Sequence, residues 1–170
     1  VTFPPPLTLT VTPTNVTCYG GNNGSASAGV GGGIAPYSYS WTPSGGSASA
    51  AGGLTAGNYS LTVTDSAGCK ISTAFVITEP PQLTATYTTN PATCSQANGS
   101  ATVLPSGGTP GYTYQWLNGQ TSATATGLGP GIYQVTVGDV SGCAITLNIA
   151  VSNVLPIVTV TSTSVTCNGG

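Results

Sequence analysis

The sequence has almost no charged residues. Its 170 residues include one Lys or Arg, three acidic residues, no His and no Met. Charged residues make up 2% of the chain, against roughly a quarter of an ordinary soluble domain. Side chains that act as general acids, general bases, metal ligands or phosphate clamps are therefore scarce. We predict that the protein is not an enzyme, has no catalytic or metal-binding residues and needs no cofactor.

The lack of positive charge also excludes a nucleic-acid partner. The formal net charge is −2 and the sequence pI is about 4.1, whereas binding to phosphates requires several cations that displace counterions. No apolar run approaches the roughly 18 residues needed to cross a bilayer, so we predict no membrane span. The N-terminus shows neither an initiator Met nor a signal pattern, and we expect a mature or excised segment.

The residues that are present form a β pattern. The hydrophobic fraction is 39% and the mean hydropathy is +0.22, which argues against disorder. Apolar residues fall in short β-branched and aromatic runs such as 7–12 and 133–137, and Gly and Pro fall between the runs. This distribution predicts an all-β protein.

A period of about 75 residues organises the chain. Such a fixed period is typical of tandem repeats. Two copies are complete, and the segment 158–170 matches 9–21 without a gap. The residues of the first copy that recur in the second are Cys18 as Cys94, Tyr37 as Tyr112, Tyr39 as Tyr114, Trp41 as Trp116, Tyr59 as Tyr133, Asp65 as Asp139 and Cys69 as Cys143.

Prolines mark the predicted boundaries between copies. We predict a Pro-rich linker at 1–6, one repeat at 7–82, a second at 83–157 and the start of a third, truncated repeat at 158–170. Because proline fixes φ and favours extended geometry, these joints should act as semi-rigid spacers that hold the units end to end.

Each copy is predicted to be a small β-sandwich. In the first copy, strands are expected at 7–12, 25–30, 37–41, 59–65 and 69–78, with a weakly patterned Gly/Ser/Ala stretch before the fourth. The first run alternates Thr with Leu or Val, which is typical of a half-buried strand. Six or seven short strands separated by turns indicate a sandwich.

The aromatic residues have structural interpretations. Trp41 and Trp116 are predicted to lie in the core, because Trp supplies the largest buried area. Tyr59 and Tyr133 follow Gly-containing turns and suit the corner tyrosine of immunoglobulin-like sandwiches. Two pairs of tyrosines at i and i+2 share one strand face, which is a candidate exposed contact surface. These residues are Tyr37, Tyr39, Tyr112 and Tyr114.

Asp65 and Asp139 occupy equivalent positions, each before a turn that ends in Gly. An Asp at such a position accepts hydrogen bonds from the backbone two residues later. Calcium binding is disfavoured, since that ion takes six to eight oxygens and usually several carboxylates.

The cysteines predict disulfides in an oxidising compartment. The favoured pairing is Cys18–Cys69 and Cys94–Cys143, with Cys167 bonded outside the segment. The alternative pairs Cys69–Cys94 and Cys143–Cys167 and leaves Cys18 odd. An extended array would place cysteines of different copies too far apart for the Cα separation of roughly 4.4–6.8 Å that a disulfide needs, which favours the first pairing. Without His or a CxxC motif, zinc is not expected.

The ordered motifs resemble a known family. The first copy contains VTCYGGNNGSASA, GGIAPYSYSW and LTAGNYSLTVTDSAGCKISTAFVITEPP, and the second contains ATCSQANGSATV, GGTPGYTYQW and GLGPGIYQVTVGDVSGC. Together they resemble the SprB-type repeat of Bacteroidetes cell-surface adhesins. The resemblance implies tandem immunoglobulin-like or PKD-like sandwiches in a large surface protein that is exported by type IX secretion, and in some cases moved in gliding motility.

The hosts of this family also suggest a modification site. Asp65-Ser66-Ala67 resembles the Asp-Ser/Thr-aliphatic O-glycosylation site of Bacteroidetes. Ser66 is therefore a candidate glycosylation site, although the second copy reads Asp139-Val140-Ser141 and breaks the pattern.

The expected function is structural. We predict a repeat segment of a long extracellular filament or adhesin stalk on a bacterial surface, whose partners are neighbouring repeats of the same chain. A binding module is the alternative, in which Tyr and Thr faces contact glycans or an abiotic surface. A second alternative is a self-assembling fibre or sheath, because edge strands with almost no charge lack the usual protection against pairing with identical chains.

Overall fold

The computed structural model describes residues 4–155, and every regular element in this range is a β-strand. The predicted third copy at 158–170, with Cys167, lies outside the described residues. The chain divides into two compact units. The first holds the described residues up to Ala85 together with Pro105–Thr113 and Val137–Ile145, and the second holds Thr86–Leu104, Tyr114–Thr136 and the described residues from Thr146 onward. Two turns of the second sequence copy thus belong to the first unit.

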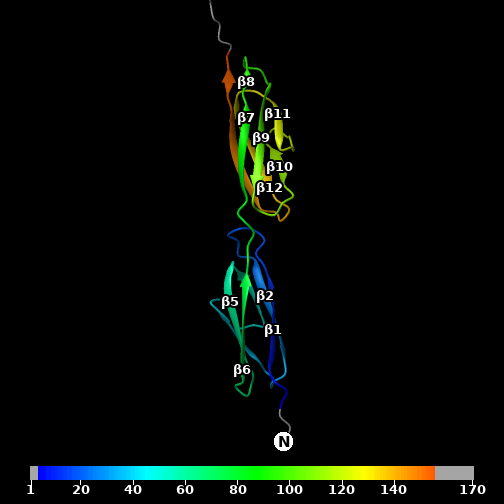
Figure 1. Ribbon diagram of the computed structural model, residues 1–170, viewed down its shortest axis with the longest axis vertical. Coiled ribbons are helices and arrows are strands. Elements are labelled where there is room, and N and C mark those ends of the chain that lie inside the picture. Colours follow the sequence, from blue (N-terminus) through cyan, green and yellow to red (C-terminus); the bar gives the residue numbers. More distant parts are fainter. Residues whose placement is uncertain (1–3, 156–170) are drawn as a thin grey trace, which may run out of the picture. The chain divides into compact units, whose positions relative to one another are not determined.

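The first copy contains two three-stranded sheets (Figure 1). One has the order β1-β2-β4 and the other β3-β5-β6. Strand β1 pairs antiparallel with β2, so that Leu9 lies opposite Val30 and Val11 opposite Ala28. The strands are β1 (Thr8–Thr14), β2 (Gly24–Gly31), β3 (Ser38–Thr42), β4 (Ala50–Leu54), β5 (Gly57–Thr64) and β6 (Lys70–Ile77).

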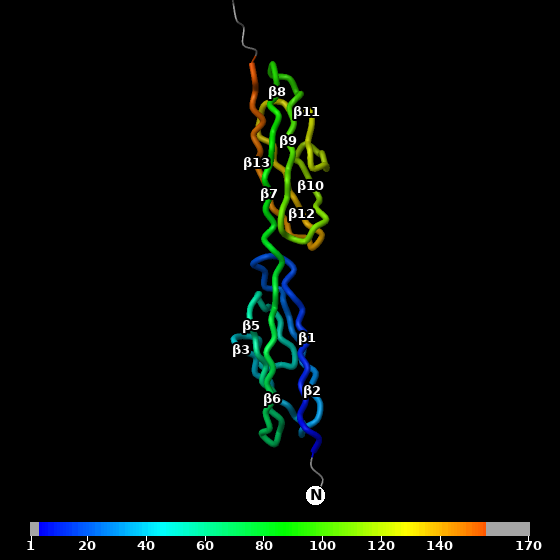
Figure 2. The backbone as a smooth tube through the Cα atoms, in the orientation of Figure 1, coloured from blue at the N-terminus to red at the C-terminus, as the bar shows by residue number. Residues whose placement is uncertain are grey.

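The second copy repeats this order. Its sheets run β11-β9-β7 and β10-β12-β13, and a short parallel pair joins β14 to β8. The tube in Figure 2 lets the reader follow the path of the chain through these strands. The strands are β7 (Thr84–Asn90), β8 (Ala92–Thr93), β9 (Gly99–Ser106), β10 (Thr113–Trp116), β11 (Thr124–Leu128), β12 (Gly131–Gly138), β13 (Ala144–Val151) and β14 (Asn153–Val154).

This topology is immunoglobulin-like. In each copy the first, second and fourth long strands form one sheet, and the third, fifth and sixth form the other. Constant-type immunoglobulin domains place strands A, B, E and D in one sheet and C, F and G in the other, so each copy has this arrangement without strand D. The prediction of an all-β chain of immunoglobulin-like sandwiches is confirmed.

The core of the first copy lies between its two sheets. Apolar residues alternate along the strands, so that Leu61 and Val63 of β5 face inward and are fully buried. Trp41 on β3 is buried and its indole N–H donates to Ala48 O at 2.8 Å, which satisfies its polar atom. The buried cluster comprises Val16, Ala26, Trp41, Ala51, Leu54, Tyr59, Leu61, Val63 and Ile77.

The second copy buries the equivalent residues. Trp116 on β10 is 1% exposed, and its indole N–H donates to Ser122 O at 2.9 Å. The placement of both tryptophans in the core is therefore confirmed. The other buried apolar residues on the long strands of this copy are Ala101, Val103, Ala125, Leu128, Val135, Val137, Ile149 and Val151.

The corner tyrosines are also confirmed. Tyr59 lies near the start of β5, and its hydroxyl donates to Thr55 O at 3.0 Å. Tyr133 lies near the start of β12 and donates to Gly129 O at 3.2 Å. Each bond ties the start of a core strand to the backbone four residues earlier, which is the role of the tyrosine corner in immunoglobulin-like sandwiches.

Candidate functional site

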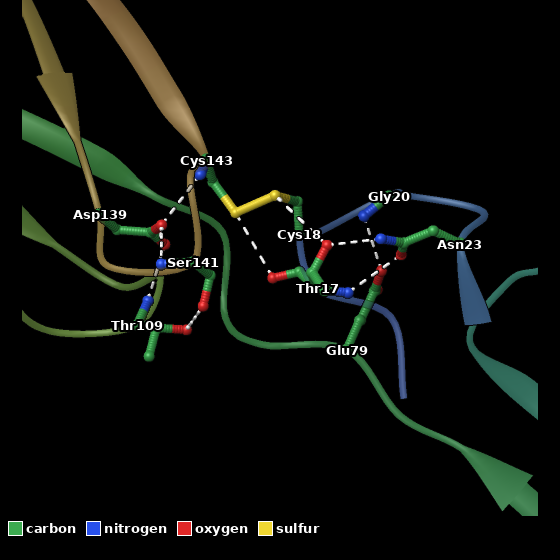
Figure 3. The surroundings of a disulfide bond; sticks show 9 residues. All are labelled: Thr17, Cys18, Gly20, Asn23, Glu79, Thr109, Asp139, Ser141 and Cys143. Carbon is green, nitrogen blue, oxygen red and sulfur yellow. Dashed lines mark hydrogen bonds between the residues drawn. A yellow bond between two sulfur atoms is a disulfide. The ribbon is translucent and has the colours of Figure 1, made fainter. Parts of the chain in front are cut away.

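A disulfide bond within the first compact unit is the main chemical feature of the described residues. Cys18 bonds to Cys143 with a Cα–Cα distance of 5.7 Å and a sequence separation of 125 residues (Figure 3). Both cysteines are partly buried. An open depression of about 410 Å³ beside the bond is lined in part by Cys18, Cys143, Tyr19 and Leu83.

The loop that carries Cys18 is held by side-chain hydrogen bonds. Asn23 Oδ1 accepts from Thr17 N at 3.1 Å, and Asn23 Nδ2 donates to Thr17 Oγ1 at 2.6 Å. Glu79, which follows β6, accepts from Gly20 N at 2.6 Å. These contacts, drawn in Figure 3, fix the cysteine loop beside the end of β6.

The turn that carries Cys143 is organised by a buried carboxylate. Asp139 Oδ1 accepts from Ser141 N and from Cys143 N, both at 2.9 Å, and Oδ2 accepts from Thr109 N at 2.9 Å. Ser141 Oγ donates to Thr109 Oγ1 at 2.9 Å. Asp139 thus positions the backbone of Cys143, one of the two cysteines of the disulfide.

The predicted disulfide pairings are wrong. Cys143 bonds to Cys18, whereas Cys69 and Cys94 are exposed and have no bonded partner among residues 4–155. Neither the favoured pairing, Cys18–Cys69 with Cys94–Cys143, nor the alternative, Cys69–Cys94 with Cys143–Cys167, agrees with this bond. The bond instead joins a cysteine of the first sequence copy to one of the second.

The length of one strand explains the error. Glu79 contacts the Cys18 loop just after β6, and Cys69 directly precedes β6. This strand has 8 residues, and a strand rises about 3.3 Å per residue, so its ends lie roughly 26 Å apart. That span far exceeds the Cα separation of a disulfide. The two cysteines of one copy therefore lie near opposite ends of its sandwich.

The interpretation of the aspartates as turn-forming residues is confirmed. Asp65 Oδ1 accepts from Ala67 N, two residues later, at 3.0 Å and from Cys69 N at 2.8 Å, while Oδ2 accepts from Ile34 N at 3.0 Å. Both aspartates are 6% exposed. The Asp65 carboxylate therefore joins its own turn to the turn after β2, and the Asp139 carboxylate joins its own turn to the turn after β9.

A glycine leaves room for each carboxylate. Gly33 has φ +63, and a Cβ at this position would lie 2.9 Å from Asp65 Oδ2. Gly108 has φ +61, and its Cβ would lie 2.7 Å from Asp139 Oδ2. Because non-glycine residues avoid this backbone conformation and a Cβ would be too close to the oxygen, both positions require glycine.

The pKa of both aspartates is lowered. For Asp65, burial acts to raise the pKa, but the N–H groups of Cys69, Ile34, Ala67 and Gly68 together outweigh it. For Asp139, the Thr109 N–H is the largest influence and lowers the pKa, and further backbone N–H groups outweigh the effect of burial. Hydrogen bonds to the charged form favour ionisation.

We expect the protein to lose stability in acid. Since the folded-state pKa lies below the ordinary value, ionised Asp65 and Asp139 stabilise the fold fully above that value, and this contribution disappears as pH falls through the folded pKa. Thermal unfolding followed by circular dichroism from pH 7 to pH 2 should show Tm falling below about pH 4.

A double variant assigns this acid response. Asp65→Asn with Asp139→Asn should lower Tm at neutral pH and flatten its dependence on pH relative to the parent, because the amides do not titrate. An equally steep acid loss in the double Asn variant would contradict the assignment.

The tyrosine pairs are half-buried. Tyr37 and Tyr39 pack against the core cluster of the first copy. The Tyr37 hydroxyl donates to Gly32 O at 2.6 Å, and the Tyr112 hydroxyl donates to Gly107 O at 2.7 Å. Tyr114 is likewise half-buried. This placement favours a structural role over the exposed contact surface that the i, i+2 spacing suggested.

Ser66 lies in the exposed turn before Cys69. Its hydroxyl donates to Ile34 O at 3.0 Å, and its backbone N–H donates to the same oxygen at 2.9 Å. Glycosylation of this serine remains a prediction from sequence.

Sequence analysis missed the residues that hold the cysteine loops. Asn23 recurs as Asn98, which bonds Thr93 in the same way as Asn23 bonds Thr17. The recurrence of Asn at the repeat period was the available signal. The role of Glu79 had no such signal, because the second copy has Asn153 at the equivalent position.

No group of three or more His, Cys, Asp or Glu side chains that could hold a metal ion occurs among the described residues. Nowhere in this part of the chain is there a helix with the length and apolarity that a bilayer crossing requires.

Comparisons with known proteins identify the repeat. The family model of the SprB repeat matches residues 10–46 and 86–121, one segment in each copy. The resemblance found in the sequence is therefore confirmed, with one segment similar to the SprB repeat in each copy. No curated protein matches the chain. Among solved structures, an amphioxus IgVJ-C2 molecule is similar at 15% identity and a TM-score of 0.34, over 71% of this chain and 90% of that one.

Proposed function

We propose, from the premise that each copy contains a segment similar to the SprB repeat, that the chain is a load-bearing segment of a long bacterial cell-surface protein. The SprB repeat is a repeat of surface adhesins, which supports a structural, non-enzymatic role outside the cell. Proline joints between successive repeats at 7–82 and 83–157 would act as semi-rigid spacers in such a stalk. Type IX export and a part in gliding motility or attachment are the finer parts of this proposal.

The Cys18–Cys143 bond carries the proposal. When the two ends of the chain are pulled, the force passes from Cys18 directly to Cys143 through the covalent bond between them. The residues between these cysteines are therefore excluded from extension even when their hydrogen bonds break. A segment that keeps most of its length hidden under load suits a stalk that holds a distal binding end away from the cell.

Pulling single molecules by their ends tests this role. In the oxidised chain, the residues between the two cysteines should add nothing to the measured contour length. After reduction, unfolding should release about 410–450 Å of additional contour length, because the bond closes a separation of 125 residues and an extended chain spans roughly 3.3–3.6 Å per residue.

The controls separate this bond from other thiols. Cys143→Ser should release the hidden length without reductant, whereas Cys94→Ser, which removes an exposed free cysteine, should behave as the parent. Release of the full length from the oxidised parent at the same force would refute the load-bearing role.

The surface location is tested separately. Antibodies raised against the purified chain should label intact cells that produce the protein, without permeabilisation. Labelling only after permeabilisation would contradict an extracellular stalk. Deletion of the producing gene, followed by attachment and spreading assays, would test the part in motility.

A further inference from the structure

The Cys18–Cys143 bond joins two cysteines that occupy different positions in their copies. Cys18 belongs to the loop after the first strand, which we call the loop cysteine, and Cys143 belongs to the Asp-led turn before the last long strand, which we call the turn cysteine. The loop cysteine of one copy is thus bonded to the turn cysteine of the next. This register leaves Cys94 as a free loop cysteine and Cys69 as a free turn cysteine.

Cys94 is held as Cys18 is held. Thr93 N donates to Asn98 Oδ1 at 2.8 Å, and Asn98 Nδ2 donates to Thr93 Oγ1 at 2.7 Å. Ser95 N, one residue after Cys94, donates to Asn153 Oδ1 at 3.0 Å, whereas in the first copy Gly20 N, two residues after Cys18, donates to Glu79. The same Asn–Thr pair therefore flanks the loop cysteine in both copies, although among the described residues only Cys18 of the two has a bonded partner.

The loop of Cys94 differs from that of Cys18 in its backbone. Cys94 has φ 53 and Ser95 has φ 58, both in the left-handed region. Non-glycine residues in this region are strained, and such strain persists where surrounding contacts enforce it. The exposed Cys94 thiol therefore lies on a loop whose backbone is held in this region by its surrounding hydrogen bonds.

Cys69 is held as Cys143 is held. Asp65 Oδ1 accepts from Ala67 N and from Cys69 N, just as Asp139 Oδ1 accepts from Ser141 N and Cys143 N. Cys69 is exposed and free. The chain thus presents one loop cysteine and one turn cysteine at the positions equivalent to the two sides of the existing disulfide, and the turn cysteine keeps the same hydrogen bonds to its aspartate.

We propose that Cys94 of one chain forms a disulfide with Cys69 of a second copy of the chain, in the register of the Cys18–Cys143 bond. A formal net charge of −2 on 170 residues gives little repulsion between copies, and proteins near zero net charge associate readily. Repetition of the bond joins chains head to tail. The inference does not rest on the proposed surface role, because it concerns thiol pairing in the purified protein.

The oxidant for this bond is a small-molecule disulfide such as oxidised glutathione. The Cys94 thiolate attacks one glutathione sulfur, and the first glutathione thiolate leaves. The Cys69 thiolate of the second chain then attacks the Cys94 sulfur of the mixed disulfide, and the second glutathione thiolate leaves. Two thiols are oxidised, one glutathione disulfide is reduced, and the two thiol protons end on the two released glutathiones.

Mixing two variants tests the pairing. Cys69→Ser keeps the loop thiol and Cys94→Ser keeps the turn thiol, and both carry Cys167→Ser so that no thiol outside the described residues contributes. After oxidation of an equal mixture with glutathione, intact mass spectrometry should show the mixed dimer in about tenfold excess over both homodimers together, a preference of about 1.4 kcal/mol. Peptide mapping should locate the bond at Cys94 and Cys69.

Random pairing of exposed thiols gives the mixed dimer in an amount equal to the two homodimers together, and this result would overturn the proposal. A mixture that stays monomeric would overturn it as well. A matched control moves the turn thiol by three residues, with Ser66→Cys added to the Cys69→Ser, Cys94→Ser, Cys167→Ser background. When this control is mixed with the Cys69→Ser variant, the mixed dimer should not exceed the two homodimers together. An excess of the mixed dimer with this control would also overturn the proposal. Circular dichroism of each variant confirms that it folds.

Discussion

Replacing Cys18 with serine is expected to lower the free energy of unfolding by about 5 kcal/mol. The Cys18–Cys143 bond closes a loop with a sequence separation of 125, and in the chain-entropy model a cross-link over so long a loop removes much of the freedom of the unfolded chain. For a chain of this size the loss corresponds to a fall in Tm of roughly 10–20 °C. Chemical reduction of the parent should have the same effect.

The matched control for this prediction is Cys94→Ser. Cys94 is exposed and unbonded, so its replacement in the monomeric chain should change stability by no more than about 0.5 kcal/mol. Thermal unfolding under oxidising conditions measures both variants. A Cys18→Ser protein as stable as the parent would show that the bond does not constrain the unfolded chain.

Trp116→Ala is expected to cost about 3–5 kcal/mol. The side chain is 1% exposed and sits on β10 among the buried residues of the second copy. Its removal leaves a cavity and also leaves Ser122 O without the indole donor. Urea denaturation followed by circular dichroism gives the change in unfolding free energy.

Leu117 offers the control at the next position. It is 80% exposed, so Leu117→Ala should change stability by no more than about 0.5 kcal/mol. Trp116→Phe should fall between the two alanine variants, since it keeps most of the apolar volume but loses one ring of the indole and the N–H that bonds Ser122 O. A small effect of Trp116→Ala would contradict the assignment of this residue to the core.

The parts of the fold that depend on local pattern were predictable from sequence. Alternation in 7–12 placed Leu and Val inward, and the turn before Tyr59 indicated a corner tyrosine. One strand, β4 (Ala50–Leu54), was missed because AAGGL contains no β-branched or aromatic residue. Its place in the sheet comes from pairing with β2, which is a tertiary effect that local propensity does not report.

The site was less predictable than the fold. The turn role of Asp65 and Asp139 follows from Asp and Gly spacing, which is local chemistry. The partner of Cys18 depends on which ends of which strands lie together, and spacing along the chain carries no such information. The half-buried state of Tyr37 and Tyr39 was missed for a related reason, because the i, i+2 rule says that they share a face without saying which side of the sheet it is.

The contact between glycine and aspartate has a consequence for how such repeats diverge. Gly33 and Asp65 are far apart in sequence, yet a Cβ on the glycine would press on the carboxylate, and the same holds for Gly108 and Asp139. A side chain at the glycine position would displace the carboxylate and so remove the reason to keep the aspartate, whereas the positive φ favours glycine even after the aspartate is lost. Among repeats of this kind, the aspartate should therefore be kept only where the glycine is kept, and this one-way dependence would mark a true repeat even where its cysteines have been replaced.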